Sequence, residues 1–77
     1  MTLDQLRFGQ QARIVAITGG RGLQRRLQQI GIHPGDTVSL ASQGSFRGPL
    51  LITVNGARLA LGRGVARRIL IEPLGGR

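Results

Sequence analysis

The chain has 77 residues and a formal net charge of +8, and it contains no cysteine. This length is typical of one small domain, so we expect residues 1–77 to fold as a single unit with a flexible tail at 73–77. Without cysteine, disulfide bonds, thiolate metal ligands and a nucleophilic thiol are excluded, which fits a reducing cytoplasm. No segment approaches the length of an apolar membrane span, so we expect a soluble, cytoplasmic protein.

All eleven basic residues are arginine, and they face only three acids, Asp4, Asp36 and Glu72. Such an excess favours an anionic partner, which can be nucleic acid, an anionic membrane surface or an acidic protein. Phe8 and Phe46 are the only aromatic residues, whereas single-stranded nucleic acid is usually bound on aromatic platforms. We therefore expect no nucleic acid partner, although contacts to a phosphate backbone stay open.

The first predicted elements are a strand and an amphipathic helix. Residues 12–17 form a short β-branched run bounded by Thr18-Gly19-Gly20, which is typical of a strand. After the glycines, Leu23, Leu27 and Ile30 fall at helical spacing with polar side chains between them. The spacing predicts a short helix that packs these three side chains against a sheet.

The end of this helix is marked by glycine and proline. Gly31 can take the left-handed conformation just after the last turn, and Ile32 can then fold back onto Leu27. Pro34 prevents the helix from continuing, and Gly35 turns the chain toward the next strand.

A strand and a polar loop are predicted next. Residues 37–41 alternate as a half-buried strand does, and residues 42–49 have the serine and glycine content of a loop. Gly48 and Pro49 end this loop. Phe46 lies at its tip, where it can contact a partner or fold back as a lid on the core.

The second half of the chain predicts a hairpin and a last strand. Residues 50–54 and 57–61 are apolar runs separated by Asn55-Gly56 alone, which indicates a type I′ hairpin. Residues 62–67 allow one helical turn, and residues 68–72 are a fifth strand. Five short strands and one helix predict a mainly β fold, a small barrel, because closure removes most exposed edges; an OB-like arrangement gives a similar pattern.

The chain offers no constellation of residues for catalysis. His33 is the only histidine, the acids are scattered, and without lysine there is no Schiff-base nucleophile and no Walker-type phosphate loop. We predict that the protein is not an enzyme. His33 is the one candidate metal ligand, but a metal site needs three or four ligands, so we expect no metal and no other cofactor.

Glycines and an arginine precede the predicted helix. Arg21 and Gly22 would place a guanidinium and free backbone N–H groups at the helix start, which makes them a candidate anion-binding site. The alternative is that glycines 19, 20 and 22 only form a tight strand-to-helix turn.

Candidate protein-binding residues are found on the helix and in the loop. Arg25 and Arg26 lie on the polar side of the helix, and Phe46 with Arg47 forms the loop tip. Arginine and aromatic side chains supply much of the binding energy at protein interfaces. Either the helix or the loop can therefore be a contact surface, and the arginines can equally be a scattered, solvated set.

The pattern of apolar residues and glycines along residues 3–72 is similar to the FeoA family. The residues that carry the resemblance are the first predicted strand at 12–17 together with Leu6, Gly9, Leu23, Leu27, Gly31, Ile32, Pro34, Gly35, Gly48, Pro49, Leu50, Leu59, Ala60, Leu61, Ala66, Ile69, Leu70 and Ile71. Residues 27–32 followed by Pro34-Gly35 are the most specific part. Ile30 departs from the pattern, because the family often has leucine there, and this volume-conserving change should cost little.

The resemblance implies an SH3-like barrel with one helix inserted after the first strand. It also implies a role in ferrous iron uptake, at the inner face of the cell membrane, through the transporter FeoB and its cytoplasmic GTPase region. The protein would bind FeoB and modulate or help assemble it. The alternative is a basic module of iron-dependent regulation that binds nucleic acid or anionic membrane, because the family also resembles SH3-like domains of iron-dependent repressors; weak self-association through a barrel edge is a further expectation.

Overall fold

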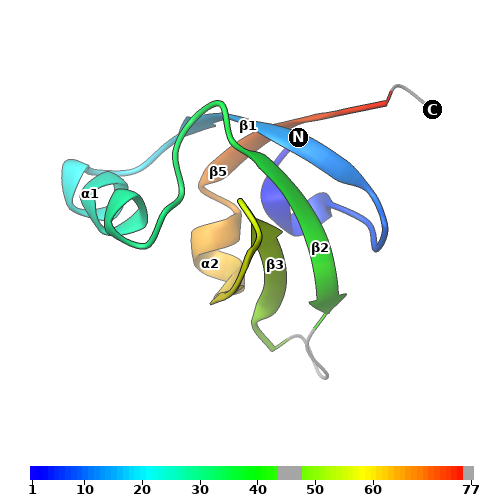
Figure 1. The fold of residues 1–77 in the computed structure, drawn as a ribbon. Helices are drawn as coiled ribbons and strands as arrows, with labels where there is room; N and C mark the ends of the chain where they lie inside the picture. Colours follow the sequence, from blue (N-terminus) through cyan, green and yellow to red (C-terminus); the bar gives the residue numbers. More distant parts are fainter. Residues whose placement is uncertain (44–47, 76–77) are drawn as a thin grey trace.

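The computed structural model describes residues 1–43 and 48–75 (Figure 1). Five strands pair antiparallel in one sheet of order β4-β3-β2-β1-β5. The prediction of a mainly β fold, with five strands and a helix inserted after the first strand, is confirmed. The elements in chain order are η1 (Leu3–Gln5), β1 (Gln11–Ile17), α1 (Arg21–Gln29), β2 (Thr37–Gln43), β3 (Leu50–Val54), β4 (Ala57–Leu61), α2 (Arg63–Ala66) and β5 (Ile69–Pro73).

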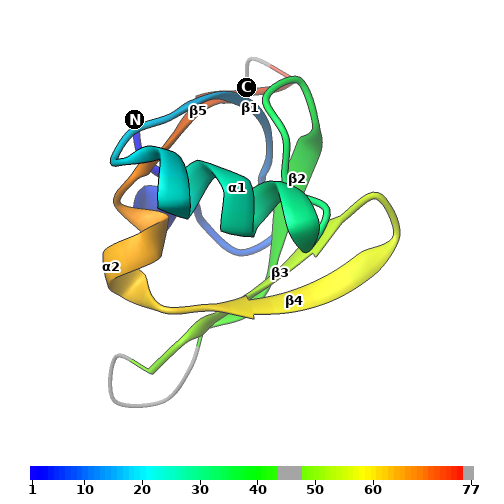
Figure 2. The ribbon, with the colours of Figure 1, turned by 90° about the vertical axis from the view of Figure 1, so that its left-hand side faces the viewer.

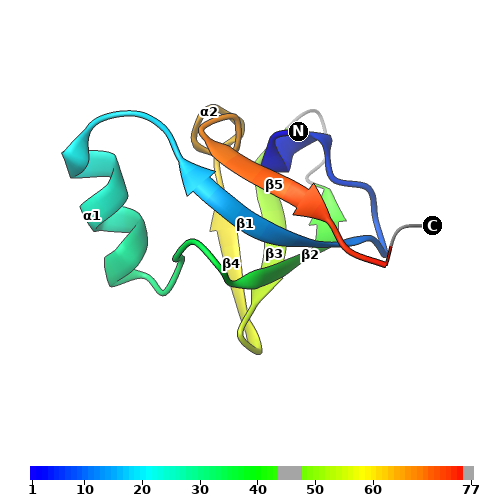
Figure 3. The ribbon, with the colours of Figure 1, turned by 90° about the horizontal axis from the view of Figure 1, so that it is seen from above.

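The strands curve around a core of apolar side chains (Figure 3). Strand β3 shows the alternation that produces this core, because Leu50, Ile52 and Val54 are buried whereas the residues between them are half-buried. Among the described residues, no polar or charged side chain is buried. Each large side chain of this core stabilises the folded state by roughly 1.5–3 kcal/mol when it leaves water. Burial of apolar side chains can therefore stabilise the core without a buried ion pair.

Strand boundaries differ slightly from those expected. Strand β1 begins one residue earlier than predicted and β2 continues to Gln43, past an irregularity in its pairing with β3 between Leu40 and Ser42. Strand β5 is shifted by one residue and ends at Pro73, which pairs with Ala12. Leu74, placed in the tail by sequence, donates its N–H to the Gln11 carbonyl at 2.9 Å, so the pairing of β1 carries the chain beyond Glu72.

The hairpin between β3 and β4 has the predicted turn. Asn55 and Gly56 take φ values of 51° and 81°, as the type I′ geometry requires. Pairing runs without interruption from Val54 with Ala57 to Leu50 with Leu61. The prediction at Asn55 and Gly56 is confirmed.

Helix α1 ends in the way the glycine and proline positions predict. Gly31 has a φ of 96° and donates its N–H to the Gln28 carbonyl at 3.1 Å, while the Ile32 N–H reaches the Leu27 carbonyl at 2.9 Å. These two bonds form a Schellman motif. After Pro34, Gly35 also has a φ of 96°.

One expectation for α1 is wrong. Ile30 does not pack on the sheet, because it is the residue after the last helical turn and is 43% exposed. The helix instead contributes Leu27, which is buried, and Leu23, which packs partly against the core. Ile32, beyond the helix end, is fully buried, so the reversal at Gly31 supplies the contact that the helical spacing assigned to Ile30.

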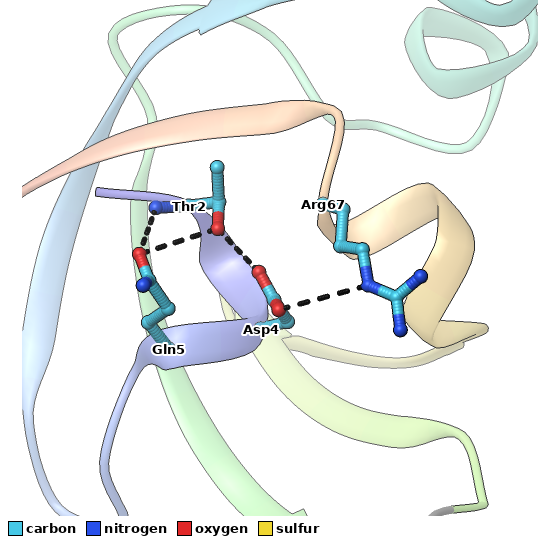
Figure 4. Close-up of polar contacts among 4 residues, drawn as sticks. All are labelled: Thr2, Asp4, Gln5 and Arg67. Carbon is cyan, nitrogen blue, oxygen red and sulfur yellow. Dashed lines mark hydrogen bonds and ion pairs between the residues drawn. The ribbon is translucent and has the colours of Figure 1, made fainter.

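A short helix that the sequence did not predict, η1, lies at the start of the chain. The Thr2 N–H and hydroxyl contact Gln5 Oε1 at 2.8 and 3.3 Å, and the hydroxyl also donates to Asp4 Oδ1 (Figure 4). Asp4 Oδ2 lies 4.0 Å from Arg67 Nε, just after α2. Leu3, which lies between Thr2 and Asp4 in the chain, is fully buried. Its burial and the contact between Asp4 and Arg67 hold the beginning of the chain against its last third.

Candidate protein-binding surface

Helix α1 stands beside the barrel instead of covering the face of the sheet (Figures 1 and 3). Leu27 anchors it from within, and Gln24 donates a side-chain hydrogen bond to the Ile17 carbonyl at 3.2 Å. The predicted contact residues Arg25 and Arg26 are both exposed, and Arg21 is exposed one turn before Arg25. The helix therefore presents a basic outer surface.

The acids of the chain do not neutralise this surface. Within residues 1–43 and 48–75, the ion pairs are Arg67 with Asp4 and His33 with Asp36. The third acid, Glu72, is the cross-strand partner of Arg13 in the β1–β5 pairing. Arginines 21, 25 and 26 thus have no acidic partner among the described residues, and Arg21 and Arg25, four residues apart, repel each other by roughly a few tenths of a kcal/mol.

The turn before α1 is tight and glycine-dependent. Gly19 has a φ of 104°, and a Cβ placed on it would lie 3.1 Å from Leu23 Cδ2 and 3.5 Å from Arg68 Nη1. Gly20 occupies the N-cap position, where it has no side chain to accept a hydrogen bond from the helix. The backbone thus requires glycine at position 19, as the turn interpretation expects, and anion binding at Arg21 and Gly22 stays a prediction.

Arg68 reaches this turn from the far end of the chain. Its carbonyl accepts hydrogen bonds from the Thr18 N–H at 2.7 Å and the Thr18 hydroxyl at 3.2 Å. No local pattern indicates this contact, because 50 residues separate the two positions. Because Arg68 Nη1 also lies close to Gly19, the turn before α1 has an added guanidinium beside it.

The second predicted contact surface, Phe46 with Arg47, lies outside the described residues. Gly48 and Pro49, which end that loop, lead directly into β3. The exposed aromatic that the structure does describe is Phe8, 75% exposed, which lines a shallow surface hollow with Arg7 and Leu74. The sequence patterns assign Phe8 no role in binding, although its place among polar residues before β1 is a signal of exposure.

His33 has a neighbour that explains its position. Its Nδ1 lies 3.4 Å from Asp36 Oδ2, and the same carboxylate oxygen accepts the His33 backbone N–H at 2.8 Å. The part of the chain that is described contains no group of three residues suited to hold a metal ion. His33 and Asp36 thus close the turn at Pro34 and Gly35.

No described helix is both long and apolar enough to cross a membrane.

The sequence of this chain matches a known protein family. A model of the FeoA domain matches residues 1–73. A protein of Methanocaldococcus jannaschii assigned as an Fe(2+) transport protein A is 31% identical over 64 residues, which are 83% of this chain and 76% of that protein.

Solved structures agree with the sequence match. The crystal structure of an iron uptake regulatory protein (FeoA) is 31% identical, with a TM-score of 0.86 over 96% of both chains. FeoA of Stenotrophomonas maltophilia, an SH3-domain protein crystallised with zinc, is 28% identical, with a TM-score of 0.79 over 94% of this chain and 89% of that one. The predicted SH3-like fold is confirmed, and the chain belongs to the FeoA family.

Proposed function

We propose that this protein is a cytoplasmic accessory of ferrous iron uptake that binds the GTPase region of the FeoB transporter and modulates or helps assemble it. Membership of the FeoA family supports the link to iron transport. The similar protein of M. jannaschii carries the name Fe(2+) transport protein A, and that of S. maltophilia has been put forward as a ferrous iron transport activating factor.

The observation that carries this proposal is the basic outer surface of α1. Arg25 and Arg26 are exposed on a helix that contains no acid, and no carboxylate among the described residues pairs with them. Arginine is the cation best suited to bidentate contacts with carboxylates at an interface. An acidic surface on the partner would therefore gain contacts here without first breaking internal ion pairs.

Binding to the isolated GTPase region tests this proposal. We expect Arg25→Glu/Arg26→Glu to weaken binding by at least about tenfold, because it reverses two charges at the contact. Arg7→Glu/Arg13→Glu is the matched control, since it changes the net charge equally on residues outside α1. Equal weakening by both variants, with both folded, would indicate general charge attraction and contradict a contact at α1.

Three further measurements separate the finer claims. The GTP hydrolysis rate with and without the protein distinguishes modulation of the GTPase from assembly alone. Deleting the protein in cells should lower FeoB-dependent iron uptake, and unchanged uptake would refute the function. A salt titration against duplex DNA tests the regulatory alternative, because phosphate-driven binding weakens steeply as salt rises.

A further inference from the structure

The two edge strands of the sheet, β4 and β5, have different surroundings. The outer edge of β5 is covered by the beginning of the chain, where the Ile71 N–H donates to the Met1 carbonyl at 2.8 Å and Thr2 forms an antiparallel bridge with Leu70. Within the described residues, no backbone hydrogen bond reaches the outer edge of β4. In Figure 2 this strand is seen below α1, running toward α2.

The hairpin turn decides which backbone groups of β4 point outward. In a two-residue hairpin, the residues that flank the turn form a hydrogen-bonded pair, and bonded and non-bonded pairs then alternate. Val54 and Ala57 flank the turn here. The N–H and C=O groups of Ala57, Leu59 and Leu61 therefore face β3, and those of Arg58 and Ala60 face away from the sheet.

Strand β4 has few of the features that prevent an edge from pairing with another chain. It contains no proline, and its register with β3 is free of bulges. Arg58 and Ala60 are both exposed, and the methyl group of Ala60 is no obstacle to an approaching backbone. Arg58 is the one feature of this strand that protects the edge. A charged side chain discourages pairing with a strand of the same charge or of no charge, but it does not discourage pairing with a strand of opposite charge.

The surroundings of β4 define the charge of a suitable partner. Strand β4, the helix α2 that follows it, and helix α1 contain arginines and no acid; these arginines are Arg21, Arg25, Arg26, Arg58 and Arg63. None of them belongs to an ion pair among the described residues. A second copy of the chain would bring another net charge of +8, so self-pairing is disfavoured by repulsion.

We infer that the outer edge of β4 binds an extended, acidic segment of the partner protein as an added strand. This inference rests on the proposed function, and it adds the chemistry and the mode of the contact. The backbone groups of Arg58 and Ala60 supply hydrogen bonds, and the neighbouring arginines select acidic side chains. The basic surface of α1 and the edge of β4 then belong to one contact.

A substitution at Ala60 tests the strand pairing. Ala60→Pro removes the outward N–H and places a ring in the path of the added strand, whereas the hydrogen bonds to β3 stay intact. We expect it to weaken binding of the FeoB GTPase region by about tenfold or more. Ala60→Ser keeps the N–H and is the matched control. Equal affinity of a folded Ala60→Pro variant would overturn the inference and leave the proposed function standing.

A second experiment needs neither the transporter nor a variant. An acidic peptide of about eight residues that alternates valine and glutamate is titrated into the protein, and backbone amide shifts are followed by NMR. We expect the largest shifts at Arg58 and Ala60, and no response to the same peptide with lysine in place of glutamate. If the acidic peptide leaves these amides unchanged, or the basic peptide moves them equally, the inference is wrong. Shifts at Arg58 and Ala60 without binding of the GTPase region would support the edge and refute the proposed partner.

Discussion

Both edges of the sheet end in a strand of five residues, yet the chain treats them differently. At β5, Met1 and Thr2 pair with the strand, and Leu3 is fully buried behind them. At β4, the outward groups of Arg58 and Ala60 have no backbone partner within the described residues. Because an unpaired edge is a hazard for a soluble protein, covering only one of them leaves the other as the place where the protein can meet another chain.

The largest expected effect comes from removing the anchor of the covered edge. Leu3→Ala should lower the free energy of unfolding by about 2–5 kcal/mol, because a fully buried leucine leaves a cavity. Leu59→Ala, in the open strand β4, should cost less, since that side chain is only half-buried. Urea unfolding measures both. Equal losses would mean that the beginning of the chain contributes no more to the fold than the open edge does.

The next effect concerns the turn that sets which residues of β4 face outward. Gly56→Ala should cost about 1–2 kcal/mol, because alanine is strained at a φ of 81°. A Cβ at Gly56 meets no atom within 4 Å, so the cost is backbone strain alone. Gly64→Ala in α2 is the control, where a Cβ also meets nothing, and it should be neutral or stabilising. Thermal unfolding of the two variants measures the difference. A Gly56→Ala variant as stable as the parent protein would contradict the assigned turn.

A smaller effect is expected at the polar contacts of η1. Thr2→Ala removes the hydroxyl that contacts Asp4 and Gln5, and should cost about 0.5–1.5 kcal/mol. Thr2→Ser keeps the hydroxyl and should retain most of the stability. Amide exchange at Ile71 should become faster in the alanine variant alone, because its acceptor, the Met1 carbonyl, is held less firmly. Equal exchange in the two variants would show that the hydroxyl does not hold this edge.

The smallest effect is expected for Arg67→Ala. Its guanidinium is largely exposed and lies 4.0 Å from Asp4, so the ion pair should contribute less than about 1 kcal/mol and weaken with salt. The comparison of urea unfolding at low and high salt measures this contribution. A larger loss that is insensitive to salt would point to packing by the arginine stem instead.

Local patterns predicted the fold well where one short segment decides it. Asn55-Gly56 fixes a turn by its own backbone preferences, and Gly31 ends α1 in the same way. Helical spacing wrongly places Ile30 against the sheet, because it does not show where the last turn ends. Three residues beyond Gln29, where the helix ends, Ile32 takes the buried position.

Features that depend on distant parts of the chain were missed. The bridge between Thr2 and Leu70 and the contact between Thr18 and Arg68 join segments that carry no mutual signal in sequence. The same limit applies to the candidate site. Arginines can be counted along the chain, but only the topology shows that β4 is an edge strand with an open outer side.

The most direct test of this account is amide hydrogen exchange of the protein, free and with the FeoB GTPase region. In the free protein, we expect Ile71 to exchange slowly and Arg58 and Ala60 to exchange fast, because of these three amides only that of Ile71 has a backbone acceptor within residues 1–43 and 48–75. With the partner, Arg58 and Ala60 should become slow while Leu59, already bonded to β3, changes little. If Arg58 and Ala60 are protected in the free protein, or stay unprotected in the complex, the open edge of β4 is not the contact.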